Sequence, residues 1–314
     1  MNAASPPLLV IAGATATGKT GLSIAVARAL AGESVNAEII SADSRQVYRG
    51  LDIGTAKATA ADRSGVPHHG LDLVEPDESF TLADFAAHAR DALAGIAARG
   101  GVAILVGGTG LYLRAVGKGI DTDALPSDPA LRASLEADLV RDGLEPLVAR
   151  LQAAAPRRAA RTDLRNPRRV VRALEIVELD GDRDSPPPRG YGGPAAWLGL
   201  NVDPAAHREW IAKRARAQFE AGLIEEARSL RERFDPTLPA FSAIGYREAW
   251  AVIDGSMTIE AAMAEDTRRN VGFAKRQRTW FRSEPGIEWL DAMDEKATRS
   301  AALAQARDLL RPNR

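Results

Sequence analysis

The chain has 314 residues, of which 45% are hydrophobic and 26% charged, and a formal net charge of −1; these values are ordinary for a globular protein of one large or two modest domains. It contains no cysteine, which excludes disulfides and thiolate metal sites and fits a reducing compartment. No segment approaches the roughly 20 apolar residues of a membrane helix, and no basic, signal-like N-terminus precedes the first apolar run, so we expect a soluble, cytoplasmic protein.

The first predicted elements are a buried strand, a phosphate loop and a helix. An apolar run covers residues 8–12, and a helical apolar pattern covers residues 22–30. Between them the sequence matches G-x-x-x-x-G-K-[ST], a loop whose N–H groups and helix dipole bind phosphate. Lys19 adds a point charge, and the hydroxyl of Thr20 is a candidate Mg²⁺ ligand. The residues predicted to bind the phosphates are Gly13, Ala14, Thr15, Ala16, Thr17, Gly18, Lys19 and Thr20.

Further strands alternate with helices along the chain. Strands are predicted at 37–43, 102–106 and 197–202, and a helix at 81–98. This alternation predicts an α/β fold with a P-loop NTPase-like parallel sheet flanked by helices. Ligands of such sheets bind beyond the carboxyl ends of the strands. We therefore expect the phosphate loop, Asp43 and Thr109 to meet in one crevice.

The middle of the chain predicts an all-helical insertion at residues 121–194. Asp128-Pro129 and Asn166-Pro167 are helix starts, each with an N-cap residue followed by proline at the first helical position. No strand-like run interrupts this stretch, and a proline- and glycine-rich linker ends it. The predicted catalytic core is therefore residues 1–120 and 195–314.

Positive charge is concentrated in two tracts. Residues 156–172 contain seven arginines and one aspartate, and residues 267–282 contain six basic residues and no acidic one, a net of +6 in each. Two such tracts beside a phosphate loop favour a polyanionic partner such as a nucleic acid. The alternative is that both are solvated helix faces paired with nearby acids.

Several single residues allow more than one interpretation. Asp43 follows a strand and is a candidate magnesium ligand, general base or helix cap. Thr109 lies in a glycine-rich turn that either faces the crevice or is a plain turn. Helical periodicity alone assigns Arg214 to the solvated surface.

Two pairs of residues have equally open interpretations. Trp280 and Phe281 either stack on bases or anchor their helix in the core. His68 and His69 are predicted to lie in a loop, with no third ligand nearby for a metal.

In chain order, these segments resemble the bacterial tRNA dimethylallyltransferase (isopentenyltransferase) family. D-S-x-x-x-Y, D-I-G-T-A-K and A-K-R-Q are more specific motifs than the phosphate loop, which many unrelated enzymes share. The resemblance extends from about residue 8 to 291. The matching segments are residues 13–20, 40–48, 52–57, 106–112, 166–175, 244–248 and 274–277 with Trp280-Phe281.

The resemblance implies transfer of a dimethylallyl group from dimethylallyl diphosphate to the N6 amine of the adenosine on the 3′ side of a tRNA anticodon. It also implies Mg²⁺ and a helical insertion that contacts the anticodon stem-loop. We expect a monomer. A P-loop small-molecule or nucleotide kinase with an arginine-rich lid is the alternative enzyme, and an RNA-binding module with a nucleotide sensor is the non-enzymatic one.

By position in the motifs, the resemblance also implies residue roles. Asp43 would accept the amine proton, Thr109 would contact the flipped base, and Arg214 with Lys19 and Thr20 would hold diphosphate and magnesium. The residues implied to contact tRNA are Asp43, Ser44, Arg45, Gln46, Thr109, Arg132, Arg168, Arg169, Val170, Val171, Arg172, Ser242, Ala243, Ile244, Gly245, Tyr246 and Arg247.

Overall fold

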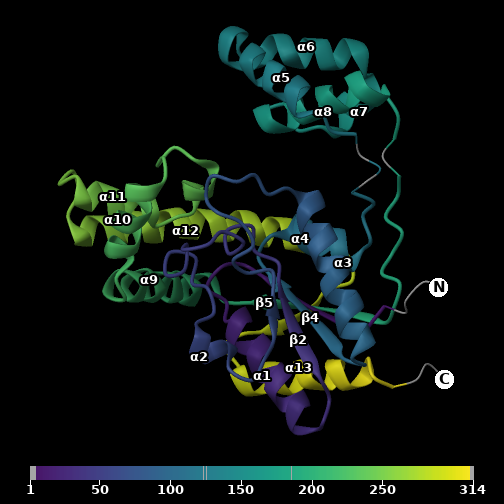
Figure 1. Cartoon of the computed structure of the whole chain (residues 1–314), viewed down its shortest axis with the longest axis vertical. Coiled ribbons are helices and arrows are strands. Elements are labelled where there is room, and N and C mark those ends of the chain that lie inside the picture. The colour runs from purple at the N-terminus through teal and green to yellow at the C-terminus, as the bar shows by residue number, and fades with distance from the viewer. Residues whose placement is uncertain (1–4, 123, 125, 185, 312–314) are drawn as a thin grey trace. The chain divides into compact units, whose positions relative to one another are not determined.

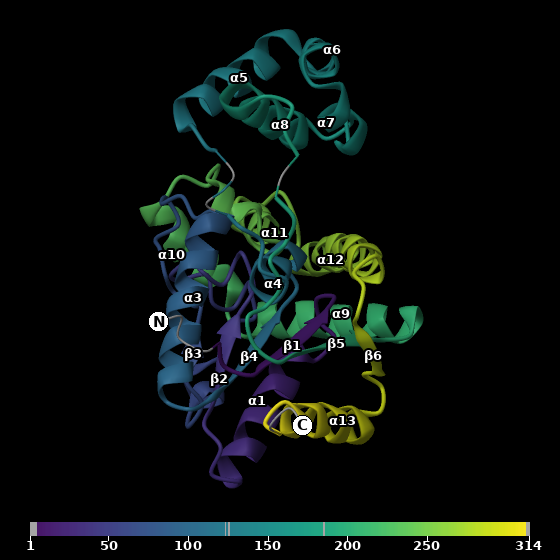
Figure 2. The same cartoon turned by 90° about the vertical axis from the view of Figure 1, so that its right-hand side faces the viewer.

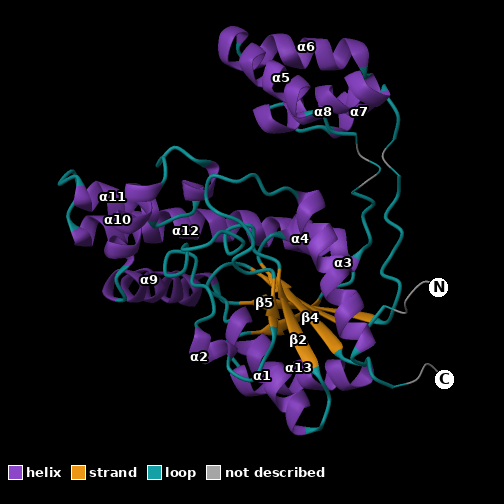
Figure 3. Ribbon diagram, in the orientation of Figure 1, coloured by secondary structure: helices purple, strands orange, loops and turns teal. Residues whose placement is uncertain are grey.

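Six parallel strands form one sheet in the order β3-β2-β4-β1-β5-β6 (Figure 3). The computed structural model describes residues 5–122, 124, 126–184 and 186–311. The central strands are buried along their whole length, which explains their continuous apolar sequences. The strands are β1 (Leu8–Gly13), β2 (Ala37–Ser41), β3 (His68–His69), β4 (Val102–Gly107), β5 (Ala195–Asn201) and β6 (Glu288–Asp291).

The chain divides into two compact units (Figure 1). The core unit comprises residues 1–119 and 190–314 and contains the sheet, and the helical unit comprises residues 120–189. Residues 190–194 pack on the sheet rather than in the helical unit, because the hydroxyl of Tyr191 donates to the carbonyl of Pro6 and Leu8 N–H donates to the carbonyl of Pro194.

Helices cover both faces of the sheet in the core unit (Figure 2). One face packs against α1 (Lys19–Gly32) and α13 (Glu295–Asp308). The other packs against α3 (Leu82–Ala98), α4 (Gly110–Gly117) and the C-terminal end of α12 (Ile259–Arg282). Beyond the carboxyl ends of the strands, a third hydrophobic cluster joins parts of α9 (Pro204–Glu220), α10 (Leu223–Arg233), α11 (Tyr246–Ile253), α12 and the turn η1 (Pro239–Ser242). The short α2 (Ala60–Arg63) precedes β3.

The helical unit has its own core of leucine, valine and alanine side chains. Its helices are α5 (Pro129–Asp142), α6 (Leu144–Ala154), α7 (Pro156–Arg161) and α8 (Pro167–Asp180). The Asp128 and Asn166 side chains cap α5 and α8 by accepting backbone N–H groups, as their sequence context predicts. No helix in the described part of the chain has the length and hydrophobicity of a membrane span.

The predicted α/β class with a flanked parallel sheet is confirmed, and three details differ from the sequence-based predictions. The strand expected at 37–43 ends at Ser41, since Ala42 and Asp43 turn away into the site. The loop prediction for His68 and His69 is wrong, because they pair with Ile39 and Ile40 as the edge strand β3. Strand β6 was not predicted, because it is four residues long and mostly exposed.

Candidate active site

The phosphate loop has the backbone conformation that its glycines predict. Gly13 and Gly18 have φ values of +155° and +84°, and Ala16 also has a positive φ of 59°. A Cβ atom at Gly13 would lie 3.1 Å from the Thr17 hydroxyl and 3.2 Å from the Leu200 carbonyl oxygen. The Thr17 hydroxyl closes the loop by donating to the carbonyl of Ala14 at 2.9 Å.

Three side chains from two distant helices hold Thr15 of this loop. From α9, His207 Nε2 donates to the Thr15 carbonyl at 2.8 Å and Arg214 Nη1 donates to its hydroxyl at 2.6 Å. From α12, Gln277 Oε1 accepts the Thr15 N–H at 2.8 Å. The loop is therefore fixed from outside as well as by its own turn.

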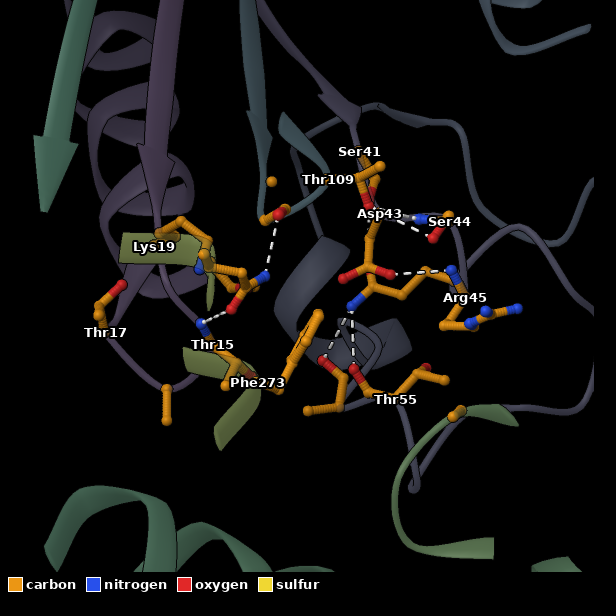
Figure 4. A pocket seen from close by; sticks show the side chains of 18 of the residues that line it. Thr15, Thr17, Lys19, Ser41, Asp43, Ser44, Arg45, Thr55, Thr109 and Phe273 are labelled. Carbon is orange, nitrogen blue, oxygen red and sulfur yellow. Dashed lines mark hydrogen bonds between the residues drawn. The ribbon is translucent and has the colours of Figure 1, made fainter. Parts of the chain in front are cut away.

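The turn after β2 and the turn after β4 are joined to one another. The N–H of Ser44 donates to the hydroxyl of Thr109 at 3.1 Å, and the N–H of Thr109 donates to the carbonyl of Ala42 at 3.2 Å. A Cβ atom at Gly107 would lie 2.0 Å from that same carbonyl oxygen, so only glycine allows this approach. Asp43 Oδ1 accepts the N–H of Arg45 at 2.9 Å, which orients the carboxylate within the turn (Figure 4).

Both turns and the phosphate loop line one cavity of about 770 Å³ in the core unit. The side chains of Lys19, Asp43 and Thr109 are drawn around it in Figure 4. The structure therefore brings together the three strand ends that the sequence pointed to. Other lining residues include Ser44, Arg45, Gln46, Arg214, Ser242, Ala243, Ile244, Phe273 and Gln277.

The cavity contains charges that lack a fixed counter-ion. Burial lowers the pKa of Lys19 to about 8, Asp43 opposes this shift, and Arg214 adds to it. Burial likewise lowers the pKa of Arg214. The Lys19 Nζ donates only to the carbonyl of Ala14, at 2.6 Å, and within the described residues neither cation forms an ion pair. Two half-buried cations without counter-ions favour an anionic ligand.

The loop at residues 53–55 is held by α10 and contacts the side chain of Gln46, which lines the cavity. Glu226 of α10 accepts the N–H groups of Ile53 and Gly54 at 2.7 and 3.0 Å, and also the hydroxyl of Tyr246. Gln46 Nε2 donates to the carbonyl of Thr55 at 3.1 Å. Glu226 lies more than 170 positions from this loop in sequence, so no local pattern could identify it.

An aromatic side chain, also missed at the sequence level, lines the cavity. Phe273 of α12 is 38% exposed, and the guanidinium of Arg276 lies 5.8 Å from its ring centroid (Figure 4). It precedes Gln277 by one helical turn, a spacing that puts both side chains on one face of the helix. The signal was therefore present in the sequence as an i, i+4 pair.

Trp280 and Phe281 belong to the core, which resolves the two interpretations of this pair. Phe281 is 1% exposed, and Trp280 packs against the same hydrophobic cluster. The guanidinium of Arg114 lies 4.5 Å from the Trp280 ring centroid. Neither ring lines the described cavity.

Not every residue with an implied tRNA contact has a free side chain. In the core unit, Ser242 and Arg247 are exposed, whereas Gly245 and Tyr246 are buried. Tyr246 packs in the third hydrophobic cluster and bonds Glu226, so we correct its role from RNA contact to support of the site.

The helical unit requires similar corrections. Val170 and Val171 of α8 are 0% and 3% exposed and pack in the core of this unit, so their side chains do not reach a partner. Arg132 and Arg172 form ion pairs with the buried carboxylate of Glu175, at 2.9 and 2.7 Å, and both remain about one-third exposed, so their contact with tRNA stays a prediction. Arg168 and Arg169 fit the implied role better, because both are exposed.

Arg168 and Arg169 are exposed in the first turn of α8. Within the described residues, neither guanidinium forms an ion pair, although other arginines of the same tract do. Their positive charge also opposes the helix dipole at this end. These two cations are thus available to an anionic partner.

The described residues contain no group of three or more His, Cys, Asp or Glu side chains that could hold a metal by itself. Thr20 and Asp43 offer oxygen atoms on the same cavity. This donor set fits Mg²⁺, which retains waters and binds proteins through one or two oxygens together with substrate phosphates.

Comparison with known proteins identifies the family. The sequence profile of the family described as IPP transferase matches residues 46–284. This chain belongs to the IPP transferase family. Among its relatives in the family, a tRNA dimethylallyltransferase of Anaeromyxobacter sp. (strain K) is 48% identical over 288 residues, which cover 90% of this chain and 92% of the relative. One of Thermus thermophilus is 43% identical over 281 residues, covering 88% and 90%.

Solved structures of the family have the same fold. The tRNA isopentenylpyrophosphate transferase of Bacillus halodurans is 37% identical, with a TM-score of 0.67 and coverage of 97% of this chain and 99% of that one. A eukaryotic dimethylallyltransferase acting on tRNA is 25% identical, with a TM-score of 0.77 and coverage of 98% and 81%.

Proposed function

We propose that this protein is a tRNA dimethylallyltransferase, which moves a dimethylallyl group from dimethylallyl diphosphate to the N6 amine of the adenosine 3′-adjacent to the anticodon. The observation that supports this proposal most directly is that the phosphate loop and the carboxylate of Asp43 line one cavity of about 770 Å³. Small-molecule sites commonly enclose roughly 300–1,000 Å³, so there is room for a prenyl diphosphate and a nucleobase. Family membership favours this reaction over the kinase alternative.

The phosphate loop is the donor side of the reaction. Residues 13–20 hold the diphosphate through backbone N–H groups other than that of Thr15, which donates to Gln277. Lys19 and Arg214 neutralise the charge that develops on the diphosphate as it leaves. The hydroxyl of Thr20 would hold Mg²⁺, which would supply further neutralisation of the diphosphate charge. Phe273, which lines the cavity, gives the dimethylallyl group an apolar wall.

Asp43 and Thr109 form the acceptor side. An adenine within a stacked anticodon loop cannot reach a cavity, so it must be extruded, at a cost of a few kcal/mol. Thr109 and residues 44–46 contact the extruded nucleotide. Asp43 stands in the same cavity to accept the amine proton.

The transfer then proceeds by displacement at the allylic carbon. The N6 nitrogen forms a bond to C1 of the dimethylallyl group, the bond from C1 to the diphosphate oxygen breaks, and Asp43 takes a proton from N6. A well-placed general base contributes about 10²–10⁴-fold to such a step. Stabilisation of the departing diphosphate is the other main contribution.

Exposed arginines hold the anticodon stem-loop. Arg168, Arg169 and Arg247 contact RNA phosphates, and Arg132 and Arg172, which also pair with Glu175, contact the tRNA as well. We place the enzyme in the cytoplasm, with its tRNA substrate. We propose a monomer, because the large hydrophobic side chains exposed in the described part of the chain belong to several different elements.

Incubation of the protein with anticodon stem-loop RNA, Mg²⁺ and dimethylallyl diphosphate, followed by mass analysis of the nucleosides, tests this function. A gain of one five-carbon unit on adenosine is the expected result. Transfer of phosphate from ATP to a small acceptor would instead establish the kinase alternative. RNA binding without modification would establish the binding module.

A further inference from the structure

Gln277 makes two hydrogen bonds that join opposite sides of the cavity. Its Oε1 accepts the N–H of Thr15 at 2.8 Å, and its Nε2 donates to the carbonyl of Gly108 at 2.9 Å. The side chain is 8% exposed, so these bonds replace water at both ends of the amide. Within the described residues, no other side chain bonds both the phosphate loop and the turn at residues 107–109.

The bridge connects the donor side of the cavity to the acceptor side. Strands β1 and β4 pair only as far as Ala12 and Gly107, and beyond them the loop and the turn separate. Gly108 is followed by Thr109, which bonds Ala42 and Ser44 on either side of Asp43. A continuous path of hydrogen bonds therefore runs from Thr15 through Gln277 to the turn that carries Asp43.

The helix that carries Gln277 is anchored on both sides of it. Ala274 packs against Ala14 of the phosphate loop, and Phe281 is buried in the hydrophobic cluster between the sheet and helices α3 and α4. Space around the bridge is also tight, because a Cβ atom at Gly108 would lie 2.4 Å from the Gln277 Nε2. The amide thus has one well-defined position.

We propose that Gln277 is a positioning residue that sets the spacing between the diphosphate and the attacking amine. This inference rests on the function proposed above. Displacement needs the nucleophile, the allylic carbon and the leaving group in line, and a shift of about 1 Å can lower the rate about 10²-fold. Both ends of the Gln277 amide are occupied by protein groups, so it acts on geometry rather than by binding a substrate.

The first test compares Gln277→Met, which keeps the volume of the side chain, with the wild type in single-turnover transfer to stem-loop RNA. We expect the rate to fall about 10- to 100-fold while the dissociation constants for pyrophosphate and for the stem-loop change by less than about twofold. Thr279→Ala, at an exposed position of the same helix, is the matched control and should keep the wild-type rate.

A double-mutant cycle then separates the bridge from general packing. Gly108→Ala displaces the Gln277 amide through the added Cβ, and its backbone conformation accepts alanine because no positive φ is present. Gly108→Ala, Gln277→Ala and the double variant should lose the same factor in rate, because each removes the same bridge. Thermal unfolding of each variant checks that the fold is retained.

Two results would overturn the proposal. The first is a Gln277→Met enzyme with a wild-type rate. The second is a double variant that recovers the activity lost in Gly108→Ala, since the clash alone would then explain that loss. Failure of the proposed function looks different: the wild-type protein itself would transfer no prenyl group, whatever residue stands at position 277.

Discussion

Buried charge has different surroundings in the two units of this protein. In the helical unit, the buried carboxylate of Glu175 is paired with Arg132 and Arg172. In the cavity of the core unit, Lys19 and Arg214 are half-buried and form no ion pair among the described residues. A charge that is paired within the protein contributes to the stability of the unit that contains it, whereas an unpaired charge favours binding of a ligand of opposite charge. Substitution should therefore reduce stability in the first case and activity in the second.

Asp43→Asn is expected to have the largest effect on activity. Asparagine keeps an oxygen that can accept the Arg45 N–H but cannot take the amine proton. The single-turnover rate of transfer should fall about 10²–10⁴-fold, while stem-loop affinity and the melting temperature stay close to wild type. Rapid-quench kinetics with mass detection measures the rate. A near-normal rate in this variant would remove Asp43 from the chemistry.

Glu175→Gln should have the converse effect, a loss of stability with the cavity unchanged. Although burial opposes it, hydrogen bonds from Arg132 and Arg172 hold the pKa of Glu175 at about 2. Removing the charge should destabilise the helical unit by about 3 kcal/mol, the low end for a broken buried pair, because both arginines are partly exposed. Hydrogen exchange of residues 129–180 measures this, with Glu178→Gln, a partner in the more exposed pair with Arg150, as the control.

The same carboxylate predicts an acid dependence. A lowered pKa in the folded state stabilises the protein above the ordinary value of 4.5, and this contribution is lost as the pH falls towards 2. The difference in protection between wild type and Glu175→Gln should therefore shrink over that range. A difference that stayed constant from pH 5 to pH 2 would contradict the pairing.

Arg214→Met should weaken binding of the diphosphate. The guanidinium bonds Thr15 in the phosphate loop but has no acidic partner within the described residues, so its charge is available to the ligand. Loss of a charge-assisted hydrogen bond corresponds to about 1.5–3 kcal/mol, or roughly 10- to 150-fold in the dissociation constant of pyrophosphate. Calorimetry measures this, and Lys213→Met, an exposed neighbour on α9, should bind as the wild type does.

Site residues that belong to a local sequence motif could be predicted, whereas those whose role depends on contacts between distant segments could not. The phosphate loop, Asp43 and Thr109 each follow a strand within a few residues, so pattern and topology were sufficient to bring them together. Gln277, Glu226 and the burial of Arg214 depend on contacts between segments more than 160 positions apart. The periodicity of α9 shows only which face Arg214 occupies, not that the phosphate loop covers that face.

The net charge of the tract at residues 156–172 likewise takes no account of ion pairs with acidic residues outside it. Arg157 and Arg161 both form ion pairs with Asp184, which lies more than 20 residues further along the chain, so this one carboxylate offsets one of their two charges. Arg168 and Arg169 have no such partner among the described residues. The net charge of the tract therefore overstates how many of its arginines are available to RNA.

Two double variants in this tract can therefore be compared, one without the unpaired Arg168 and Arg169 and one without the ion-paired Arg157 and Arg161. Replacing Arg168 and Arg169 with alanine should reduce the slope of log K against log salt for stem-loop binding by about 1.4–1.8, since each phosphate contact contributes about 0.7–0.9. Replacing Arg157 and Arg161 should reduce the slope by less than this, because Asp184 already offsets one of their two charges. Equal losses in the two double variants would mean that the tract binds RNA through its total charge, and that the ion pairs to Asp184 open when tRNA arrives.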